Sequence, residues 1–507
     1  MPPPAQVAAA PNNSDVLGSR ITLAIAVAIA LLHIITNTRY GLHRDEFQFL
    51  ADARHLDWGF VAYPPFTSAI ERLSMAIFGL WLPGLRLFSV LAQATAIVIA
   101  GAMARDLGGR TTAQALTAFA VALSPLPLFE GTEFQYSSFD YLWWVLASWA
   151  LIRLLRDENP RWWLLIGASL GFGLETKYSI LFYIAGLIGA MLLTSARRWF
   201  FNRWFWAGVA LTLLIVLPNA IWQLQHNFIS YRFLQHIHAR DVRIGRTGGF
   251  FHDQLIICFN LAAVPIALVG LFSTFRSRTY RPIAWLFVLT LALFAIAKGR
   301  GYYTAPLYPM LLAAGAAAWE RWLAPRHAIL RRSLATLAFA SIAAIGAYAC
   351  AILVPLADSG PLRSFALARN GDLREETGWD IMLHSIAQVR DSLSPDQQAH
   401  LGLVLGNYGE AGAVEILGPQ YHLPPPIAGT NSFWLRSYPS SQPTTNIVLG
   451  VGDDDREAQF TGCRLAAHVP YPPGQNNEES NDHAEIYLCG PPRLPWPELW
   501  KIALGFG

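Results

Sequence analysis

Long apolar runs alternate with short polar connections along most of the chain. A membrane helix needs about 20 mostly apolar residues to cross roughly 30 Å of hydrocarbon. Runs of about this length, or somewhat shorter, lie at residues 21–38, 86–104, 113–129, 140–155, 162–176, 179–195, 205–222, 254–273, 283–297, 303–319 and 334–355. The two short runs beside Lys177 also fit one broken or re-entrant helix. The pattern predicts an α-helical polytopic membrane protein with about eleven transmembrane helices.

The arginines predict which connections face the cytoplasm. They concentrate in every second connection: Arg105 and Arg110; Arg153, Arg156 and Arg161; Arg197, Arg198 and Arg203; Arg276, Arg278 and Arg281; and Arg321, Arg326, Arg331 and Arg332. Cytoplasmic loops carry an excess of Lys and Arg. The alternate connections, including a large first loop at 39–85, are therefore predicted to be periplasmic.

A change of pattern after Pro355 predicts a second domain. Long apolar runs stop there, and short alternating stretches such as "HLGLVLGNY" and "TTNIVLGVG" are typical of strands. We therefore expect a disordered cytoplasmic tail at 1–20, a transmembrane domain at 21–355 and a soluble periplasmic α/β or α+β domain at 356–507.

Composition supports the membrane assignment and narrows the chemistry. Of 507 residues, 53% are hydrophobic and 14% are charged, whereas soluble domains carry about 25% charged residues. No Walker A loop, paired CxxC or HExxH motif is present. No cofactor is therefore predicted with certainty and no nucleic-acid partner is expected, although a divalent metal held by carboxylates stays open.

The four cysteines divide between the two predicted domains. Cys258 and Cys350 fall within apolar runs, whereas Cys463 and Cys489 lie in the predicted periplasmic domain. In an oxidising compartment the second pair is a candidate disulfide. Two unpaired thiols are the alternative, because spacing alone does not establish geometry.

Ionisable residues gather in the predicted periplasmic loops. The first loop begins with "YGLHRDEFQF", which contains Arg44, Asp45 and Glu46. Charged groups at the edge of a membrane span are costly to desolvate and are often functional. The alternative for the two acids is that they cap the next helix, since negative charge is favourable at a helix N-terminus.

Other outward loops add groups that suit a phosphate and a sugar. These loops contain Asp140, Lys177, Tyr178, His226, Lys298, Arg300, Tyr302 and Tyr303. Cations bind phosphate, and carboxylates bind sugar hydroxyls or accept a proton. For each cation alone, a side chain that extends to lipid headgroups is the alternative. Their occurrence together on one predicted face favours a shared binding cavity.

The order of several motifs resembles a known family. The acidic pair is followed by "LDWGFVAYPPF", "SSFDYLWW", "GFGLETKYS", "PNAIWQLQHNF", "GYYTAPLYP" and "NYGEAGAVEILG". This order is similar to that of bacterial polytopic glycosyltransferases of the C-type fold (GT-C). Within them, the chain resembles the protein-mannosyltransferase-like group that includes the aminoarabinose lipid A transferases. The resemblance extends over nearly the whole chain.

The resemblance implies inverting sugar transfer from a polyprenyl-phosphate donor to an envelope acceptor, on the periplasmic face of the bacterial inner membrane. By position, Asp45 matches the acid of the family's first loop and Asp140 the acid of its second. Lys177 matches the lysine after the "GLxxxTK" stretch, and Tyr302 and Tyr303 match a tyrosine pair.

Simple chemistry assigns further roles to this set. Cations such as Lys177, Lys298 and Arg300 would stabilise the leaving lipid phosphate. Asp45 would be the catalytic base for a hydroxyl acceptor, whereas with a phosphate acceptor it would position groups or help to bind a metal. Glu46, Arg44, Asp140, Tyr178, His226, Tyr302 and Tyr303 complete the predicted substrate-binding set.

The chain departs from the family beside the proline pair of its first loop. Many relatives have an acid or a lysine there, whereas this sequence has Ala62 and Tyr63. The departure weakens the assignment of an aminoarabinose donor or a lipid A acceptor. Two other classes stay open: a protein that binds or flips lipid-linked sugars, and a secondary transporter.

Overall fold

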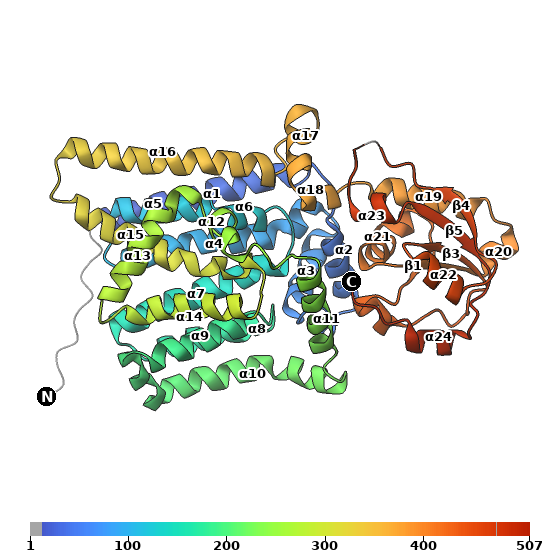
Figure 1. The fold of residues 1–507 in the computed structure, drawn as a ribbon, viewed down its shortest axis with the longest axis horizontal. Coiled ribbons are helices and arrows are strands. Elements are labelled where there is room, and N and C mark those ends of the chain that lie inside the picture. The colour runs from blue at the N-terminus through green and yellow to red at the C-terminus, as the bar shows by residue number, and fades with distance from the viewer. Residues whose placement is uncertain (1–12, 473) are drawn as a thin grey trace.

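The computed structural model describes residues 13–472 and 474–507 and shows a helical bundle joined to a smaller α/β domain. Figure 1 shows the two parts at opposite ends of the long axis, with the bundle helices lying roughly along that axis. The smaller domain therefore adjoins one end of the bundle and leaves the flank of the bundle uncovered.

Every predicted apolar run falls on one helix of the bundle or on two or three consecutive helical segments. These helices are α1 (Asn13–Thr36), α4 (Leu82–Asp106), α5 (Thr111–Ala122), α6 (Pro125–Glu130), α7 (Tyr136–Asp157), α8 (Trp162–Leu174), α9 (Ile180–Leu192), α10 (Arg203–Gln225), α12 (Phe250–Ile256), α13 (Val264–Arg276), α14 (Arg281–Ile296), α15 (Tyr308–Leu323) and α16 (Ala328–Leu353), with short 3-10 turns η1 (Ser195–Phe201), η2 (Leu261–Ala263) and η3 (Gly301–Leu307). By length and apolar composition, four helices of the described chain suffice to cross a membrane, or up to six if each of two bent pairs is one span.

The predicted disordered tail at 1–20 is wrong for its last part. Helix α1 begins at Asn13, well before the apolar run, and Asp15 in its first turn is favourable for the helix dipole. The Ser19 hydroxyl donates to Oε1 of Gln114 on α5 at 3.4 Å, so this first stretch packs against the bundle. Residues 1–12 lie outside the described residues.

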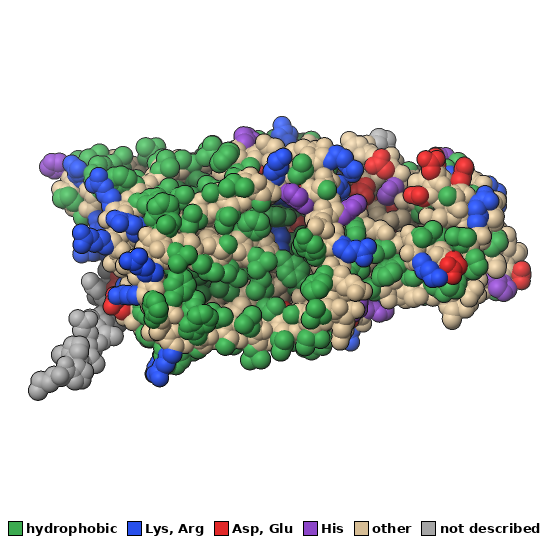
Figure 2. Space-filling model, turned by 60° about the horizontal axis from the view of Figure 1, so that its bottom comes forward, with side chains coloured by type: hydrophobic (Ala, Val, Ile, Leu, Met, Phe, Trp, Pro, Cys, Tyr) green, Lys and Arg blue, Asp and Glu red, His purple; other side chains and the backbone are tan. Residues whose placement is uncertain are grey.

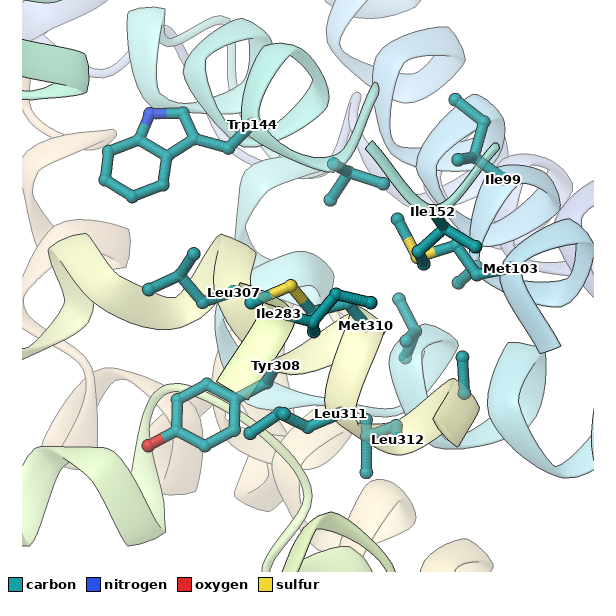
Figure 3. Packing of buried hydrophobic residues seen from close by; sticks show 14 of the residues in the cluster. Ile99, Met103, Trp144, Ile152, Ile283, Leu307, Tyr308, Met310, Leu311 and Leu312 are labelled. Atoms are coloured by element: carbon teal, nitrogen blue, oxygen red, sulfur yellow. The ribbon is translucent and has the colours of Figure 1, made fainter. Parts of the chain in front are cut away.

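Large apolar side chains fill the centre of the bundle. Figure 3 shows Trp144 of α7, Met103 of α4 and Met310 of α15 among these buried side chains. Helices α13 and α15 cross where Gly270 faces Gly315, and a Cβ built on either glycine would lie within 2 Å of a backbone oxygen of the other helix. Small residues thus allow the close approach that is common between membrane helices.

Three helices at the end of the bundle lie outside the apolar runs. They are α2 (Arg44–Arg54), α3 (Phe66–Phe78) and α11 (Ile229–Arg243). Figure 1 shows α11 running across the bundle direction, at the end that faces the C-terminal domain. Helix α2 lies between the bundle and this domain, where it packs against α21 (Tyr408–Leu417).

The C-terminal domain is built on a mixed five-stranded sheet in the order β2-β1-β3-β5-β4. Strands β2, β1 and β3 are parallel, and β5 and β4 are antiparallel to their neighbours. A disulfide joins Cys463 to Cys489. The strands are β1 (Leu401–Leu405), β2 (Pro426–Ile427), β3 (Thr445–Leu449), β4 (Arg464–His468) and β5 (Glu485–Cys489), and the helices besides α21 are α17 (Gly360–Arg369), α18 (Gly371–Glu375), α19 (Trp379–Asp391), α20 (Pro395–Ala399), α22 (Asp453–Gln459), α23 (Glu478–Asp482) and α24 (Trp496–Ile502), with turns η4 (Gly418–Tyr421) and η5 (Asn431–Arg436).

The surface divides along the same axis. Figure 2 shows apolar side chains covering the flank of the bundle and Lys and Arg side chains gathered at the end away from the C-terminal domain. Acidic side chains in this view lie mainly on the C-terminal domain. An apolar belt with a basic end is the distribution expected of a protein embedded in a bilayer.

Candidate functional site

A cavity of about 710 Å³ lies at the end of the bundle beneath the C-terminal domain. One part of its wall is apolar and comes from α6, α12, η2 and α16: Leu126, Phe129, Ile256, Ile257, Leu261, Ile345, Tyr348, Ala349, Ile352 and Leu353. The other part is polar: His43, Asp45, Glu130, Glu133, Gln135, Tyr136, Arg300, Tyr302 and Asp372. The cavity therefore suits a ligand with a long apolar part and a polar head.

Asp45 lies in the polar wall with both carboxylate oxygens engaged. Oδ2 accepts a hydrogen bond from Nε2 of Gln135 at 2.9 Å, and Oδ1 accepts one from the Tyr408 hydroxyl at 2.7 Å. Burial opposes ionisation of this carboxyl group, but the nearby His43 and the two donors outweigh it and hold the pKa of Asp45 below its usual range. Asp45 is therefore a carboxylate at neutral pH.

Glu46, also predicted to bind substrate, is held by contacts within the protein. It closes a capping box by accepting the His43 backbone N–H at 2.7 Å. Its two oxygens also accept from Nε and Nη2 of the fully buried Arg86 at 2.8 and 2.7 Å, and from the Phe134 backbone N–H at 2.7 Å. Glu46 does not line the cavity. Its hydrogen bonds connect the start of α2 to α4 and to the loop before α7.

Two cations lie at the polar end of the site. Arg300, which lines the cavity, pairs with Asp241 on α11 at 2.6 Å. Lys177 lies behind the wall, with its Nζ over the rings of Tyr136, Tyr302 and Tyr303 at 4.7, 5.4 and 4.0 Å. No carboxylate of the described chain lies within 4.0 Å of this Nζ, so its donors are not held by an ion pair.

Several other predicted residues lie away from the cavity wall. Asp140 accepts from Trp144 Nε1 and the Ser179 hydroxyl, and Tyr178 hydrogen-bonds Asn219. Arg44 pairs with Glu478 of α23. The remaining two are His226, which stacks on Trp222 at 3.9 Å between ring centroids, and Lys298, which is exposed. The predicted substrate-binding role of these five is not supported by contact with the cavity, because their side chains bind other parts of the protein or solvent.

The predicted set leaves out seven polar groups of the wall or its support: His43, Glu130, Glu133, Gln135, Tyr136, Asp372 and Tyr408. Four of these seven contact one another or Asp45. His43 and Glu133 lie 3.3 Å apart, Nδ1 to Oε2, and Gln135 donates to Asp45 from the same loop as Glu133. The fourth group, Tyr408, belongs to the C-terminal domain. Glu133 and Gln135 lie just before the stretch "SSFDYLWW", and Tyr408 lies within "NYGEAGAVEILG", but no local pattern connects these stretches to Asp45.

The stretch that departs from the family has a packing role here. The Tyr63 hydroxyl donates to Asp52 and shares a hydrogen bond with Ser68, and its ring packs against Phe49 and Phe60. No group of three or more His, Cys, Asp or Glu side chains able to hold a metal occurs within residues 13–472 and 474–507.

Comparison with known proteins agrees with this architecture. Residues 62–222 match the dolichyl-phosphate-mannose-protein mannosyltransferase family. The solved structure of ArnT from Cupriavidus metallidurans bound to undecaprenyl phosphate superimposes with a TM-score of 0.54 at 15% identity, over 92% of this chain and 97% of that one. This chain therefore shares the overall fold of that ArnT structure.

Two curated relatives extend the comparison to sequence. The lipid A galacturonosyltransferase RgtD of Rhizobium johnstonii is 30% identical over 223 residues, which cover 41% of this chain and 45% of that protein. The undecaprenyl phosphate-alpha-4-amino-4-deoxy-L-arabinose arabinosyl transferase of Pseudomonas paraeruginosa is 28% identical over 300 residues, 54% of this chain and 53% of that protein. The chain thus spans about half the length of the curated relatives it matches.

Proposed function

We propose that this protein transfers a sugar from a polyprenyl-phosphate donor to an envelope acceptor, with inversion at the anomeric carbon. The observation that carries the proposal is the divided wall of the cavity, in which an apolar face from α6, α12 and α16 adjoins a polar end with Asp45 and Arg300. A lipid phosphate that carries a sugar has the same division. The similarity to an undecaprenyl phosphate-aminoarabinose transferase and to the ArnT structure with bound undecaprenyl phosphate supports this class of donor.

The polar groups divide naturally between the two reacting ends. Arg300 would stabilise the negative charge that develops on the leaving phosphate. Lys177, which lies against the rings of Tyr136, Tyr302 and Tyr303, would add positive charge from behind the wall. Asp45 would accept the proton of the acceptor hydroxyl while the oxygen of that hydroxyl attacks the anomeric carbon from the face opposite the phosphate. The bond from that carbon to the phosphate oxygen breaks, and the polyprenyl phosphate leaves with the electron pair.

We further propose that the site and the C-terminal domain are periplasmic in the bacterial inner membrane. The basic end of the bundle lies away from this domain, and basic ends face the cytoplasm. A phosphatase that is active only in the periplasm, fused after Gly507, is expected to be active. An inactive phosphatase fusion, together with a fluorescent cytoplasmic reporter at the same position, would reverse the orientation.

Mass spectrometry of envelope lipids tests the proposed function in the cell. A deletion strain is expected to lose one glycosylated lipid, polysaccharide or glycoprotein species. The wild-type gene restores it, and a gene with Asp45→Asn does not. Loss of the sugar with lipid-linked donor accumulating on the cytoplasmic side, together with rescue by the Asp45→Asn gene, would instead favour a flippase.

A further inference from the structure

The C-terminal domain reaches the proposed catalytic carboxylate directly. Tyr408 is the first residue of α21, and its hydroxyl donates to Oδ1 of Asp45 at 2.7 Å across 363 positions of the chain. Gln135 supplies the donor to the other oxygen from the bundle side. We infer that Tyr408 is a positioning residue that fixes the orientation of Asp45, so that the site is complete only when the C-terminal domain is docked.

Local structure fixes the Tyr408 side chain before it meets Asp45. Asn407 caps α21: its side-chain oxygen accepts the Glu410 N–H, and the Glu410 carboxylate accepts the Asn407 N–H. This capping box sets the direction of the first turn. The guanidinium of Arg44 lies 4.8 Å from the centre of the Tyr408 ring, and Arg44 also pairs with Glu478 of the C-terminal domain. Ring and hydroxyl are therefore held by separate contacts.

The C-terminal domain packs closely against α2 beside Tyr408. Gly412, one turn further along α21, faces Phe47 of α2, and a Cβ on Gly412 would lie 2.7 Å from the Phe47 Cβ and 2.8 Å from its backbone. Arg436 adds an ion pair to Asp52 at the other end of α2. With α2 clamped in this way, the Tyr408 hydroxyl has little freedom to leave Asp45.

The charged and titratable groups around Asp45 come from three parts of the chain. His43 caps α2 and Arg44 begins it, Glu133 lies in the loop before α7 and Tyr136 begins α7, and Tyr408 and Glu478 belong to the C-terminal domain. Hydrogen bonds to a carboxylate favour its charged form. Loss of the Tyr408 hydroxyl therefore allows Asp45 to take up a proton at higher pH, and leaves the other groups in place.

This inference rests on the proposed function for its catalytic consequence, but the coupling between Tyr408 and Asp45 can be measured without any transfer. We would measure binding of radiolabelled undecaprenyl phosphate to the purified full-length protein between pH 3 and pH 8. The four proteins are wild type, Tyr408→Phe, Asp45→Asn and the double variant. Phenylalanine keeps the ring under Arg44 and removes only the donor.

Protonation of Asp45 removes a negative charge from the cavity that receives the phosphate. The rise in affinity on acidification is therefore expected to begin about one pH unit higher in Tyr408→Phe than in wild type, the size of one hydrogen bond to a charged group. In the Asp45→Asn background the same substitution is expected to leave the pH profile unchanged. Identical profiles for wild type and Tyr408→Phe would overturn the inference.

Turnover separates this coupling from the proposed function. If wild type forms a glycoside, Tyr408→Phe is expected to lower kcat about tenfold or more with little change in KM, since one charged hydrogen bond is lost in orienting the base. The control is Tyr421→Phe, which removes an exposed hydroxyl bonded to Asp380 in the same domain. Failure of wild type to form a glycoside would reject the proposed function and leave the binding profile to decide on Tyr408. An equal fall in kcat for both Phe variants would contradict the positioning role.

Discussion

Neighbouring acids at positions 45 and 46 have different roles because their hydrogen-bond partners differ. Glu46 meets a buried arginine and two backbone N–H groups, so its charge is neutralised within the protein. Asp45 has two neutral donors and lines the cavity, so its charge is directed at the ligand. The alternative that both acids serve as caps therefore holds for Glu46 alone.

Removal of the buried guanidinium of Arg86 should strongly lower the stability of the folded protein. Arg86→Met leaves Glu46 without its cation among other buried carboxylates, and breaking such a buried pair costs about 3–5 kcal/mol. We expect a large fall in the thermal unfolding temperature, with partial recovery in Arg86→Met combined with Glu46→Met. The control is Arg72→Met on the exposed side of α3. Equal unfolding temperatures for the two arginine variants would contradict the structural role of Arg86.

Glu376 is expected to make stability depend on pH. Burial and the neighbouring Glu46 raise its pKa to about 8 against the pull of Arg86. A carboxyl group whose folded pKa is raised contributes stability below its unfolded pKa of about 4.5, and that contribution is lost as pH rises toward about 8. Glu376→Gln should therefore raise the unfolding temperature relative to wild type at pH 8 and change it little at pH 4.5. A difference that is the same at both pH values would show that Glu376 is already ionised in the folded protein.

At the scale of elements, the contact between α2 and α21 joins the two parts of the molecule. Helix α2 has a short amphipathic sequence that no apolar run predicts, and it presents Phe47 to α21 on one side and Asp45 to the cavity on the other. The orientation of the C-terminal domain and the geometry of the site therefore depend on the same helix.

A methyl group added between α2 and α21 should disturb both the orientation of the C-terminal domain and the geometry of the site. Gly412→Ala places a Cβ against Phe47, whereas Gly452→Ala enters open space at a backbone conformation that alanine adopts. We expect Gly412→Ala to increase protease cleavage between the bundle and the C-terminal domain and to lower sugar transfer, with Gly452→Ala unchanged. Wild-type behaviour of both variants would show that the contact is not tight in solution.

At the scale of the whole molecule, sequence pattern predicted the helices better than the site. Apolar runs place the long helices of the bundle because burial in lipid requires them, whereas α2, α3 and α11 lie outside these runs. The start of α1 and the packing of α2 depend on contacts with α5 and α21, which hydropathy does not record. Of the predicted set, Asp45, Arg300 and Tyr302 reach the cavity wall. The others are charged or aromatic residues that the fold uses to connect its own elements, and their partners are distant in sequence.

Reconstituted transfer tests the central claim most directly. Wild-type protein and Asp45→Asn would be placed in proteoliposomes with undecaprenyl-phosphate-linked 4-amino-4-deoxy-arabinose, galacturonic acid or mannose, and with labelled envelope lipid as acceptor. We predict that wild type forms a glycoside from one of these donors. Asp45→Asn is expected to bind undecaprenyl phosphate but to form at least 100-fold less product, as for loss of a general base. Full transfer by Asp45→Asn would contradict the account, as would movement of labelled donor across the vesicle without any glycoside.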